Sequence, residues 1–274
     1  AILLQYKNEN ILIDCGEGTQ RQFKIAKLHP SKLTKILLTH WHGDHVLGLP
    51  GLFQTLKMSD YNKTLNIYGP KRTNLFVSQL KSLFNLKINT KTQEVFSKFL
   101  DEKDFYIEAK QMDHITPCLA FAFVIKEKLR LDKKKIKKLK IPNSPLLGKL
   151  GQGKDITLKG KKIKSSQVTY KEPQRKVTFI LDTALNPNSI SIAKDSDLLI
   201  CESTFTQADK ERAKKYKHLT AQDAATIAKK SKTKQLILTH LSQRYEHNTK
   251  PIEQEAKKVF KNTSLAKDFD VIEI

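Results

Sequence analysis

The residues best suited to chemistry are three histidines and an aspartate that lie within six positions of one another. They follow a short apolar run that ends at Thr39, and they are His40, His42, Asp44 and His45. If the run is extended, His40 and His42 lie on the same side of the backbone, because side chains repeat every two residues in a strand. Imidazole nitrogens and carboxylate oxygens are the ligands that suit Zn²⁺ and similar divalent ions. The chain has only 8 histidines, so this density favours a metal site over a histidine-rich surface turn.

Further candidate ligands follow other apolar runs. His114 comes just before one such run, whereas Asp182 and His240 each end one. Taken singly, a histidine or aspartate at a strand end is more often a cap or a surface residue. Taken together, the candidates supply seven ligands: His40, His42, Asp44, His45, His114, Asp182 and His240. Four ligands as close as those of the first motif cannot all bind one ion comfortably, so the set favours two ions that share one carboxylate.

The apolar runs that must position these residues predict an α/β protein built on sheets. Strand patterns cover Ile2–Tyr6, Asn10–Asp14, Leu33–Thr39, Leu65–Tyr68, Phe105–Ala109, Ala120–Ile125, Val177–Leu181, Leu198–Ile200 and Leu236–Thr239. Helical spacing covers Gln20–Leu28, Asn74–Leu86, Ala221–Ser231 and Ile252–Val259. Gly48, Pro50 and Gly51 indicate a break in regular structure. Short strands mixed with helices, with metal-type residues at strand ends, are typical of the α/β class.

Length and composition indicate an ordinary globular protein. The 274 residues suffice for one large domain or two small ones. No apolar run approaches the ~18 residues of a membrane-spanning helix, and the first residues lack the layout of a signal peptide. Cys15, Cys118 and Cys201 are far apart and odd in number. They form neither a disulfide framework nor a paired-cysteine zinc site, so we expect reduced, buried thiols in a cytoplasmic protein.

The net charge of +22 is extreme, and its distribution points to a partner. A lysine-biased proteome explains part of the excess, but such a bias would spread it evenly. Instead, residues 126–176 contain 18 basic and 4 acidic residues. This segment therefore carries about two thirds of the net positive charge of the chain. This segment has a lysine-dense helical piece, Lys133–Leu139, followed by many glycines and prolines, and it predicts an inserted arm with few apolar residues in its core. Its charge favours a nucleic-acid partner.

The ligand set resembles a known superfamily. The histidine motif, followed in order by His114, Asp182 and His240, resembles the metallo-β-lactamase superfamily. Within it, the chain resembles the tRNase Z (ribonuclease Z) family, the endonucleases that trim tRNA 3′ trailers. The narrower resemblance covers essentially the whole chain and rests on Asp14–Gln20, Ile141–Leu150, Cys201–Phe205, His218–Thr220 and His240–Tyr245.

The resemblance implies a metallo-β-lactamase fold, a four-layer αββα sandwich with a protruding basic arm. Residues 1–274 would form a single domain, and residues 126–176 would be its inserted tRNA-binding arm. Family members usually carry a strand before the segment that begins at Ala1, so the resemblance leaves open whether the first strand is missing. Cys201 stands where the family motif commonly has histidine, and we assign it no catalytic role.

The resemblance also implies which residues carry the chemistry. Two Zn²⁺ ions per subunit would be held by the seven ligands, the first by His40, His42 and His114, the second by Asp44, His45 and His240, with Asp182 between them. Asp44 would accept the proton of the attacking water. His218, oriented by Glu202, would protonate the leaving ribose oxygen. The substrate would be bound by Arg244, Lys149, Lys161 and Lys162.

The expected function is that of a zinc-dependent endoribonuclease acting on precursor tRNA. It would remove 3′ trailers, leaving a 3′-hydroxyl on the tRNA and a 5′-phosphate on the trailer. The family also implies a homodimer in which the arm of one subunit serves the site of the other. One alternative is a hydrolase of a small phosphodiester, sulfate ester or thioester, although a small substrate has no use for a basic insertion. Another alternative is a tRNA-binding protein without catalysis. The presence of a suitable residue at all seven ligand positions argues against it.

Overall fold

The computed structural model describes residues 1–158 and 160–274, which form two compact units. The first unit comprises Ala1–Glu102, Tyr106–Phe123 and Lys176–Ile274, and the second comprises Lys103–Phe105 and Val124–Arg175. The basic segment singled out in the sequence, residues 126–176, therefore lies in the second unit except for its last residue. No helix in the described part of the chain is long and apolar enough to cross a membrane.

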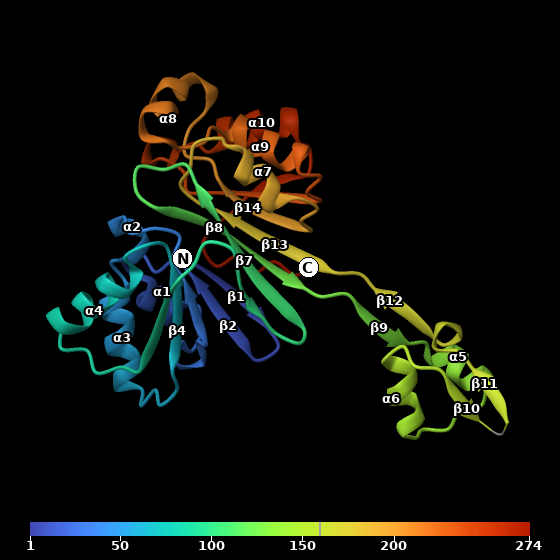
Figure 1. The fold of residues 1–274 in the computed structure, drawn as a ribbon. Helices are drawn as coiled ribbons and strands as arrows, with labels where there is room; N and C mark the ends of the chain where they lie inside the picture. Colours follow the sequence, from blue (N-terminus) through green and yellow to red (C-terminus); the bar gives the residue numbers. More distant parts are fainter. Residues whose placement is uncertain (159) are drawn as a thin grey trace. The chain divides into compact units, whose positions relative to one another are not determined.

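A five-stranded sheet forms the first half of the first unit (Figure 1). In spatial order its strands are β1 (Ile2–Tyr6), β2 (Glu9–Ile13), β3 (Lys35–Leu37), β4 (Leu65–Gly69) and β5 (Thr90–Glu94). The β1–β2 pair is antiparallel, and β2 to β5 run parallel. All three residues of β3 are buried, as expected for a strand inside a parallel sheet that is covered on both faces. The helices of this half are α1 (Thr19–Ile25), α2 (Gly43–Val46), α3 (Leu49–Met58) and α4 (Thr73–Leu83).

A seven-stranded sheet forms the other half. In spatial order its strands are β16 (Thr263–Leu265), β15 (Gln235–Thr239), β14 (Leu198–Glu202), β13 (Arg175–Ile180), β8 (Cys118–Ile125), β7 (Phe105–Met112) and β6 (Lys98–Asp101). Strands β13 to β16 are parallel. The helices of this half are α7 (Pro187–Ala193), α8 (Lys210–Tyr216), α9 (Ala221–Lys230) and α10 (Lys250–Val259). Across both units of the described chain, single 3₁₀ turns lie at Pro30–Lys32, Ser165–Gln167, Gln207–Asp209 and Gln243–Tyr245.

The two sheets pack face to face, and helices cover their outer faces. Aromatic rings join the sheets: Tyr6 of β1 lies 5.5 Å from Phe123 of β8, and Tyr68 of β4 lies 4.8 Å from Phe99 of β6. Side chains of α1 and α3 pack on the outer face of the first sheet in one core cluster, and α9 and α10 pack on the second sheet in another. This is the expected four-layer αββα arrangement of the metallo-β-lactamase fold.

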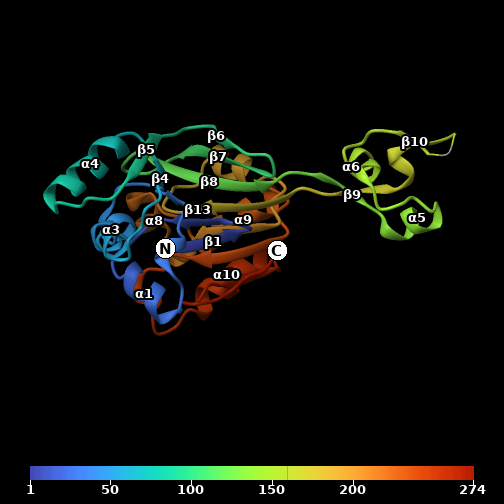
Figure 2. The ribbon, with the colours of Figure 1, turned by 90° about the horizontal axis from the view of Figure 1, so that it is seen from below.

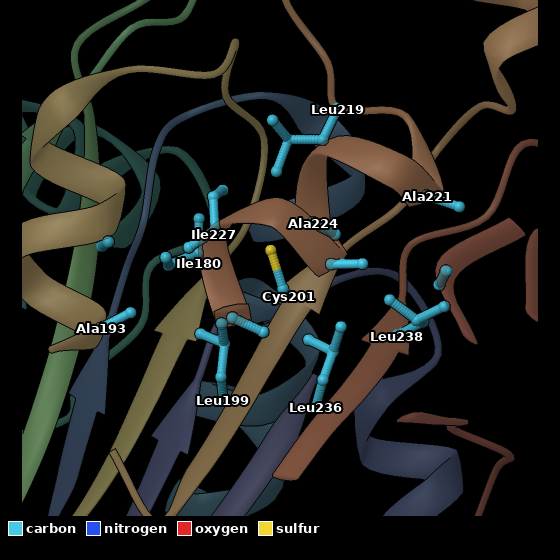
Figure 3. Close-up of a cluster of buried hydrophobic side chains, with 14 of the residues drawn as sticks. Ile180, Ala193, Leu199, Cys201, Leu219, Ala221, Ala224, Ile227, Leu236 and Leu238 are labelled. Carbon is cyan, nitrogen blue, oxygen red and sulfur yellow. The ribbon is translucent and has the colours of Figure 1, made fainter. Parts of the chain in front are cut away.

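Cys201 lies inside the core cluster between α9 and the second sheet. Figure 3 shows its sulfur between Ile180, Leu199 and Ala224. Burial raises the pKa of this thiol well above its ordinary value, so the side chain remains a neutral thiol in the core. Because side chains alternate along a strand, the next residue, Glu202, faces the other side of the sheet. The cysteine is therefore a packing residue, in agreement with its exclusion from the catalytic set.

The second unit has a small core of its own, which the sequence did not predict. Its elements are β9 (Lys128–Leu131), α5 (Lys133–Lys138), α6 (Pro145–Gly151), β10 (Ile156–Leu158), β11 (Lys161–Ile163) and β12 (Thr169–Glu172). Strands β9 and β12 pair antiparallel, as do β10 and β11. The buried residues are Ile141, Leu150, Ile156, Ile163 and Val168. The predicted arm with few apolar residues in its core corresponds to this unit, whose sparse apolar residues gather in one small cluster.

The residue pattern did not predict helix α3 either. Pro50 and Gly51 predict a break, but the proline occupies the first turn of the helix, where its fixed φ fits and no hydrogen bond is lost. The helix places Leu49, Leu52 and Phe53 in the core of the first sheet. Both views show α3 and α4 on the same flank of the first unit (Figure 1, Figure 2).

Candidate metal centre

The candidate ligands gather at the carboxyl ends of parallel strands. His40 and His42 follow β3, Asp182 follows β13, and His240 follows β15. The carboxyl ends of parallel strands meet at one edge of a sheet, which is where α/β proteins bind ligands. Of the remaining predicted ligands, Asp44 and His45 lie on α2, and His114 lies in the turn between β7 and β8. The structure therefore brings all seven candidates together from segments up to 200 residues apart in the sequence.

The first ligand cluster consists of His40, His42, His114 and Asp182. His114 Nε2 lies 3.2 Å from His42 Nδ1, and His40 Nε2 lies 3.5 Å from Asp182 Oδ2. All but His42 are buried. This is the group that the sequence assigned to one ion.

The second ligand cluster consists of Asp44, His45, Asp182 and His240. Nε2 of His240 lies 3.2 Å from Asp182 Oδ1 and 3.4 Å from Asp44 Oδ2. Nε2 of His45 lies 3.3 Å from Asp44 Oδ2 and 3.4 Å from Asp182 Oδ1. Asp182 belongs to both clusters, with one oxygen nearer each, as a bridging carboxylate requires. Each cluster thus takes two ligands from the segment that follows β3 and two from the second sheet.

The donor atoms fit divalent cations. In the described part of the chain, His40 Nε2, His45 Nε2 and Asp182 Oδ1 are buried and have no hydrogen-bond partner. Buried polar atoms are nearly always satisfied, and each exception needs an explanation. Cations coordinated by these three atoms would supply the missing partners. The orphaned atoms and the nitrogen–oxygen donor set therefore both point to a metal centre.

Hydrogen bonds to Nδ1, the ring nitrogen that points away from the other ligands, orient three of these imidazoles. Nδ1 of His40 lies 3.0 Å from the Thr39 hydroxyl, Nδ1 of His45 lies 2.7 Å from Asp14, and Nδ1 of His114 lies 3.1 Å from the backbone oxygen of Lys217. In each case Nε2 faces the other ligands. Such outer hydrogen bonds fix the tautomer and ring orientation of metal-binding histidines.

Residue types and spacing predict no role for Asp14, but its buried carboxylate lies behind both ligand clusters. One oxygen accepts a hydrogen bond from the Thr39 backbone N–H, and the other accepts from the Thr39 hydroxyl and from His45, all at 2.7 Å. Since Thr39 also contacts His40, one buried carboxylate supports a ligand of each cluster. The signal for it was present in the chain, because Asp14 directly follows β2, the strand that pairs with β3.

Three residues at the centre hold backbone conformations that glycine prefers. The φ angles of Asp14, Asp182 and His240 are +55°, +31° and +56°. Each costs on the order of 1–3 kcal/mol, and such residues cluster at functional sites where the surrounding structure enforces them. The strain at Asp182 and His240 lies at the two strand ends that turn their side chains into the site.

The electrostatics of the clusters differ from residue to residue. Burial lowers the pKa of His40 to about 3, which keeps its imidazole neutral. Burial would also lower the pKa of His45, but the carboxylates of Asp14, Asp182 and Asp44 outweigh it and raise the pKa to about 12. Asp44, close to His240 and His45, has a pKa far below its ordinary value and stays ionised.

Glu202 and His218 form a pair beside the second cluster. Glu202 is the last residue of β14 and is completely buried. Each oxygen of its carboxylate lies 3.2 Å from His218 Nδ1. It also accepts a hydrogen bond of 2.6 Å from the backbone N–H of Thr183, the neighbour of Asp182. Burial lowers the pKa of His218, but the hydrogen bond and charge of Glu202 raise it above its ordinary value. The predicted pair is therefore in contact and next to the ligands, and Glu202, His218 and His240 form a third group with metal-ligand spacing.

The predicted substrate-binding residues are placed differently. Arg244 lies four residues beyond His240, and its guanidinium forms an ion pair of 3.0 Å with Asp209, which occupies part of its hydrogen-bonding capacity. Lys149, Lys161 and Lys162 are exposed in the second unit. Lys162 lies 3.6 Å from Asp155 in an ion pair, and all three side chains are exposed at the surface, where a polyanion can reach them.

Comparisons with known proteins agree with the geometry. A family model described as the metallo-beta-lactamase superfamily matches residues 1–73, which include the histidine motif. The ribonuclease Z of Enterococcus faecalis is 40% identical over 284 residues, covering 99% of this chain and 90% of that protein. The ribonuclease Z of Nanoarchaeum equitans is 37% identical over 275 residues, covering 100% of this chain and 87% of that protein.

Among solved structures, the short form of human tRNase Z is similar in fold. It superposes with a TM-score of 0.70 at 27% sequence identity, over 99% of this chain and 91% of that one. These comparisons cover 99–100% of this chain and 87–91% of the relatives.

Proposed function

Because the chain belongs to the ribonuclease Z family, we propose that it is a zinc-dependent endoribonuclease that removes 3′ trailers from precursor tRNA. Cleavage leaves a 3′-hydroxyl on the tRNA and a 5′-phosphate on the trailer. The observation that carries the proposal is the two ligand clusters that share Asp182, with the Glu202–His218 pair beside them. That arrangement offers a hydrolytic metal centre and a separate proton donor within one site.

Two Zn²⁺ ions per subunit fit the seven ligands, one in each cluster. When bound, they supply Lewis acidity, which makes hydroxide available near neutral pH and stabilises charge on the phosphate oxygens. The chain holds the ligands in place through Asp14, Thr39 and the backbone of Lys217.

Asp44 is the proton acceptor in this proposal. Its side chain is 65% exposed, whereas the side chain of Asp182 is 3% exposed, so it is the cluster carboxylate that substrate and water reach. Its pKa far below the ordinary value keeps it in the basic form. A positioned carboxylate within reach of the water meets the requirements of a general base.

His218 is the proton donor for the leaving oxygen. The carboxylate of Glu202 occupies Nδ1 of the ring, so Nε2 is the nitrogen that can deliver a proton to the departing ribose 3′ oxygen. The raised pKa of His218 favours the protonated form that this role needs. Glu202 also fixes the orientation of the ring, as carboxylates do for catalytic imidazoles.

The second unit binds the tRNA through phosphates. Its exposed lysines include Lys149, Lys161 and Lys162, and α5 adds a run of further lysines. Lysine contacts to phosphate give affinity and orientation with little base specificity. Arg244, in the first unit near the metal centre, contacts the phosphate of the cleaved nucleotide or its neighbour with the part of its guanidinium that Asp209 leaves free.

We further propose that the protein is a homodimer in the cytoplasm, in which the arm of one subunit serves the site of the other. Exposed apolar side chains on the flank of α3 and α4 support a protein interface: Met58, Leu75, Leu83 and Phe84. The three cysteines are free and buried, which suits a reducing compartment.

Cleavage-site mapping on a 5′-end-labelled precursor tRNA tests the function. With zinc, the full chain should give one tRNA product that ends in a 3′-hydroxyl, and Asp44→Ala should reduce cleavage by more than about 100-fold while tRNA binding persists. Hydrolysis of bis(p-nitrophenyl) phosphate with the precursor tRNA left intact would instead make the protein a small-molecule phosphodiesterase. Tight tRNA binding without bound zinc would make it a binding protein.

A further inference from the structure

The third group with metal-ligand spacing, formed by Glu202, His218 and His240, already has an occupant. The hydroxyl of Thr204 lies 2.6 Å from Glu202 Oε2, 3.1 Å from His240 Nδ1 and 3.3 Å from His218 Nδ1. It contacts one side-chain polar atom of every member of the group, and it also lies 2.9 Å from the backbone oxygen of His240. A side-chain hydroxyl of this chain therefore takes the place that a third cation would need.

The hydrogen-bonding capacity of a hydroxyl determines what this contact does. A hydroxyl donates one hydrogen bond and accepts up to two. Its shortest contact is to the Glu202 carboxylate, which can only accept, so Thr204 donates there. The backbone oxygen of His240 is a second acceptor for this hydrogen at 2.9 Å, and it too can only accept. With its hydrogen directed to either oxygen, the hydroxyl can only accept from the His240 ring, so a hydrogen bond between them places the hydrogen on Nδ1 of His240. This leaves the lone pair of His240 on Nε2, the atom that faces Asp182 at 3.2 Å and Asp44 at 3.4 Å.

The same hydroxyl also restrains the partner of His218. Glu202 is fully buried, and besides Thr204 it accepts from Thr183 N–H and contacts His218 Nδ1. A bond from Thr204 to Oε2 and one from Thr183 to Oε1 fix the plane of the carboxylate from both sides. The orientation of the His218 ring therefore depends on Thr204 through Glu202.

We propose that Thr204 is a positioning residue that couples the metal ligand His240 to the proton donor His218. Its one hydroxyl sets the tautomer of His240 and the orientation of the carboxylate that holds His218. The part that concerns His218 rests on the proposed function. The part that concerns His240 requires only that the clusters bind metal.

Zinc affinity, measured by chelator competition, tests the His240 part without catalysis. Thr204→Val removes the hydroxyl but keeps the shape, and it should weaken binding of one zinc by about 10–100-fold, the usual effect of losing an outer hydrogen bond to a ligand. Thr204→Ser keeps the hydroxyl and should stay within about threefold of the parent. Thr178→Val is the matched control, because Thr178 is a fully buried threonine whose hydroxyl bonds to Ser196 rather than to a ligand. Its zinc affinity should equal that of the parent.

Two substrates with different leaving groups test the His218 part, at zinc concentrations that saturate every variant. The ribose 3′ oxygen needs a proton to depart, whereas p-nitrophenolate leaves without one. Thr204→Val should therefore lose more single-turnover rate on precursor tRNA than on bis(p-nitrophenyl) phosphate, with an unchanged dissociation constant for tRNA. Thr204→Ser should restore both rates. Thermal unfolding of the Thr204 and Thr178 variants checks that each is folded.

Three results would overturn the proposal. Parent-like zinc affinity and cleavage in Thr204→Val would show that the hydroxyl positions nothing. A Thr204→Ser variant as defective as Thr204→Val would show that the methyl group, not the hydroxyl, matters. An equal rate loss on both substrates would overturn the coupling to His218. If the parent itself leaves every precursor tRNA intact, the proposed function fails together with the His218 part, and the zinc comparison still decides the His240 part.

Discussion

Asp14 is buried, yet its carboxylate connects both ligand clusters. It accepts hydrogen bonds from Thr39 and His45 at 2.7 Å, and Thr39 in turn contacts His40. A buried carboxylate that accepts several hydrogen bonds orients its donors and raises the basicity of a ligand imidazole. The precise aim of the histidine motif therefore depends on a residue from the preceding strand.

Asp14→Asn should weaken zinc binding by about 10–100-fold. The amide keeps the size of the side chain but replaces one acceptor oxygen by a donor, so either Thr39 or His45 loses its partner. Chelator competition measures the effect. Glu9→Gln is the matched control, because it removes a partly buried carboxylate that pairs with Lys35 away from the metal centre. Equal zinc affinity in Asp14→Asn and the parent would contradict the role assigned to Asp14.

Zinc affinity should increase with pH, because protons compete with the metal. Without metal, the surrounding carboxylates raise the pKa of His45 to about 12 and that of His240 above its ordinary value. The His45 imidazole therefore holds a proton at neutral pH that must leave when a cation binds. For each proton released, the affinity rises by about tenfold per pH unit. Competition assays between pH 6 and pH 8 measure the slope, and a flat or falling profile would contradict it.

Residue types and spacing identified the ligands whose pattern is local, and the family resemblance supplied the Glu202–His218 pair, whereas the roles of Asp14 and Thr204 depend on contacts across the fold. The histidine motif is dense enough to be recognised in one stretch, and His114, Asp182 and His240 stand at strand ends. Asp14 and Thr204 act only through partners that the folded chain brings close. Thr204 contacts His240, 36 residues away, and no local pattern of residue types encodes such a contact.

At the scale of helices and strands, periodicity predicted the long elements and failed for short or irregular ones. Helix α9 was expected at 221–231 and is found at Ala221–Lys230, where Thr220 and Asp223 form a capping box. Strand β16 and helix α2 have only three and four residues, too few for a period to be visible. Helix α3 was missed because Pro50 is compatible with a first helical turn.

Helix α5 supplies the sharpest test of tRNA binding by the second unit. Its lysines are exposed, so substitution should leave the fold intact. The triple change Lys133→Ala, Lys134→Ala and Lys137→Ala should weaken tRNA binding. It should also reduce the slope of log Kd against log salt concentration by the amount expected for the loss of about two to three phosphate contacts. Hydrolysis of bis(p-nitrophenyl) phosphate should not change.

The matched control removes three exposed lysines from the first unit: Lys230, Lys258 and Lys261. Net charge changes equally in both variants, so a general electrostatic effect would affect them alike. Equal losses of tRNA affinity would therefore argue against a specific role of the second unit.

At the scale of the whole molecule, the proposed homodimer predicts a sensitive apolar flank. Leu83 is 75% exposed on α4, and Leu83→Asp should convert the dimer to a monomer, because a buried charge without a partner is costly. Light scattering coupled to size-exclusion chromatography measures the mass. Ile25→Asp, at an exposed apolar position on α1, is the control and should remain dimeric. A parent protein of monomeric mass would contradict the homodimer.

Removal of metal should destabilise the first unit as a whole. Each cluster takes ligands from both sheets, so bound cations hold the sheets together and stabilise the folded state by mass action. If the dissociation constants for zinc are well below the free zinc concentration, chelation should lower the midpoint of thermal unfolding by about 5–10 °C. Differential scanning calorimetry with and without chelator measures the shift. An unchanged midpoint would mean that the clusters bind no metal under these conditions.

The order in which the chain is made gives the shared aspartate a further consequence. The ligands on α2 and after β3 emerge from the ribosome first, but both clusters need Asp182, and the second also needs His240. Domains fold from the N-terminus as they are synthesised, so the first sheet can form long before either ion has a complete set of ligands. A nascent chain shorter than residue 240 therefore has no complete two-metal centre. Nuclease activity can arise only late in synthesis, when the strand that carries His240 joins its sheet.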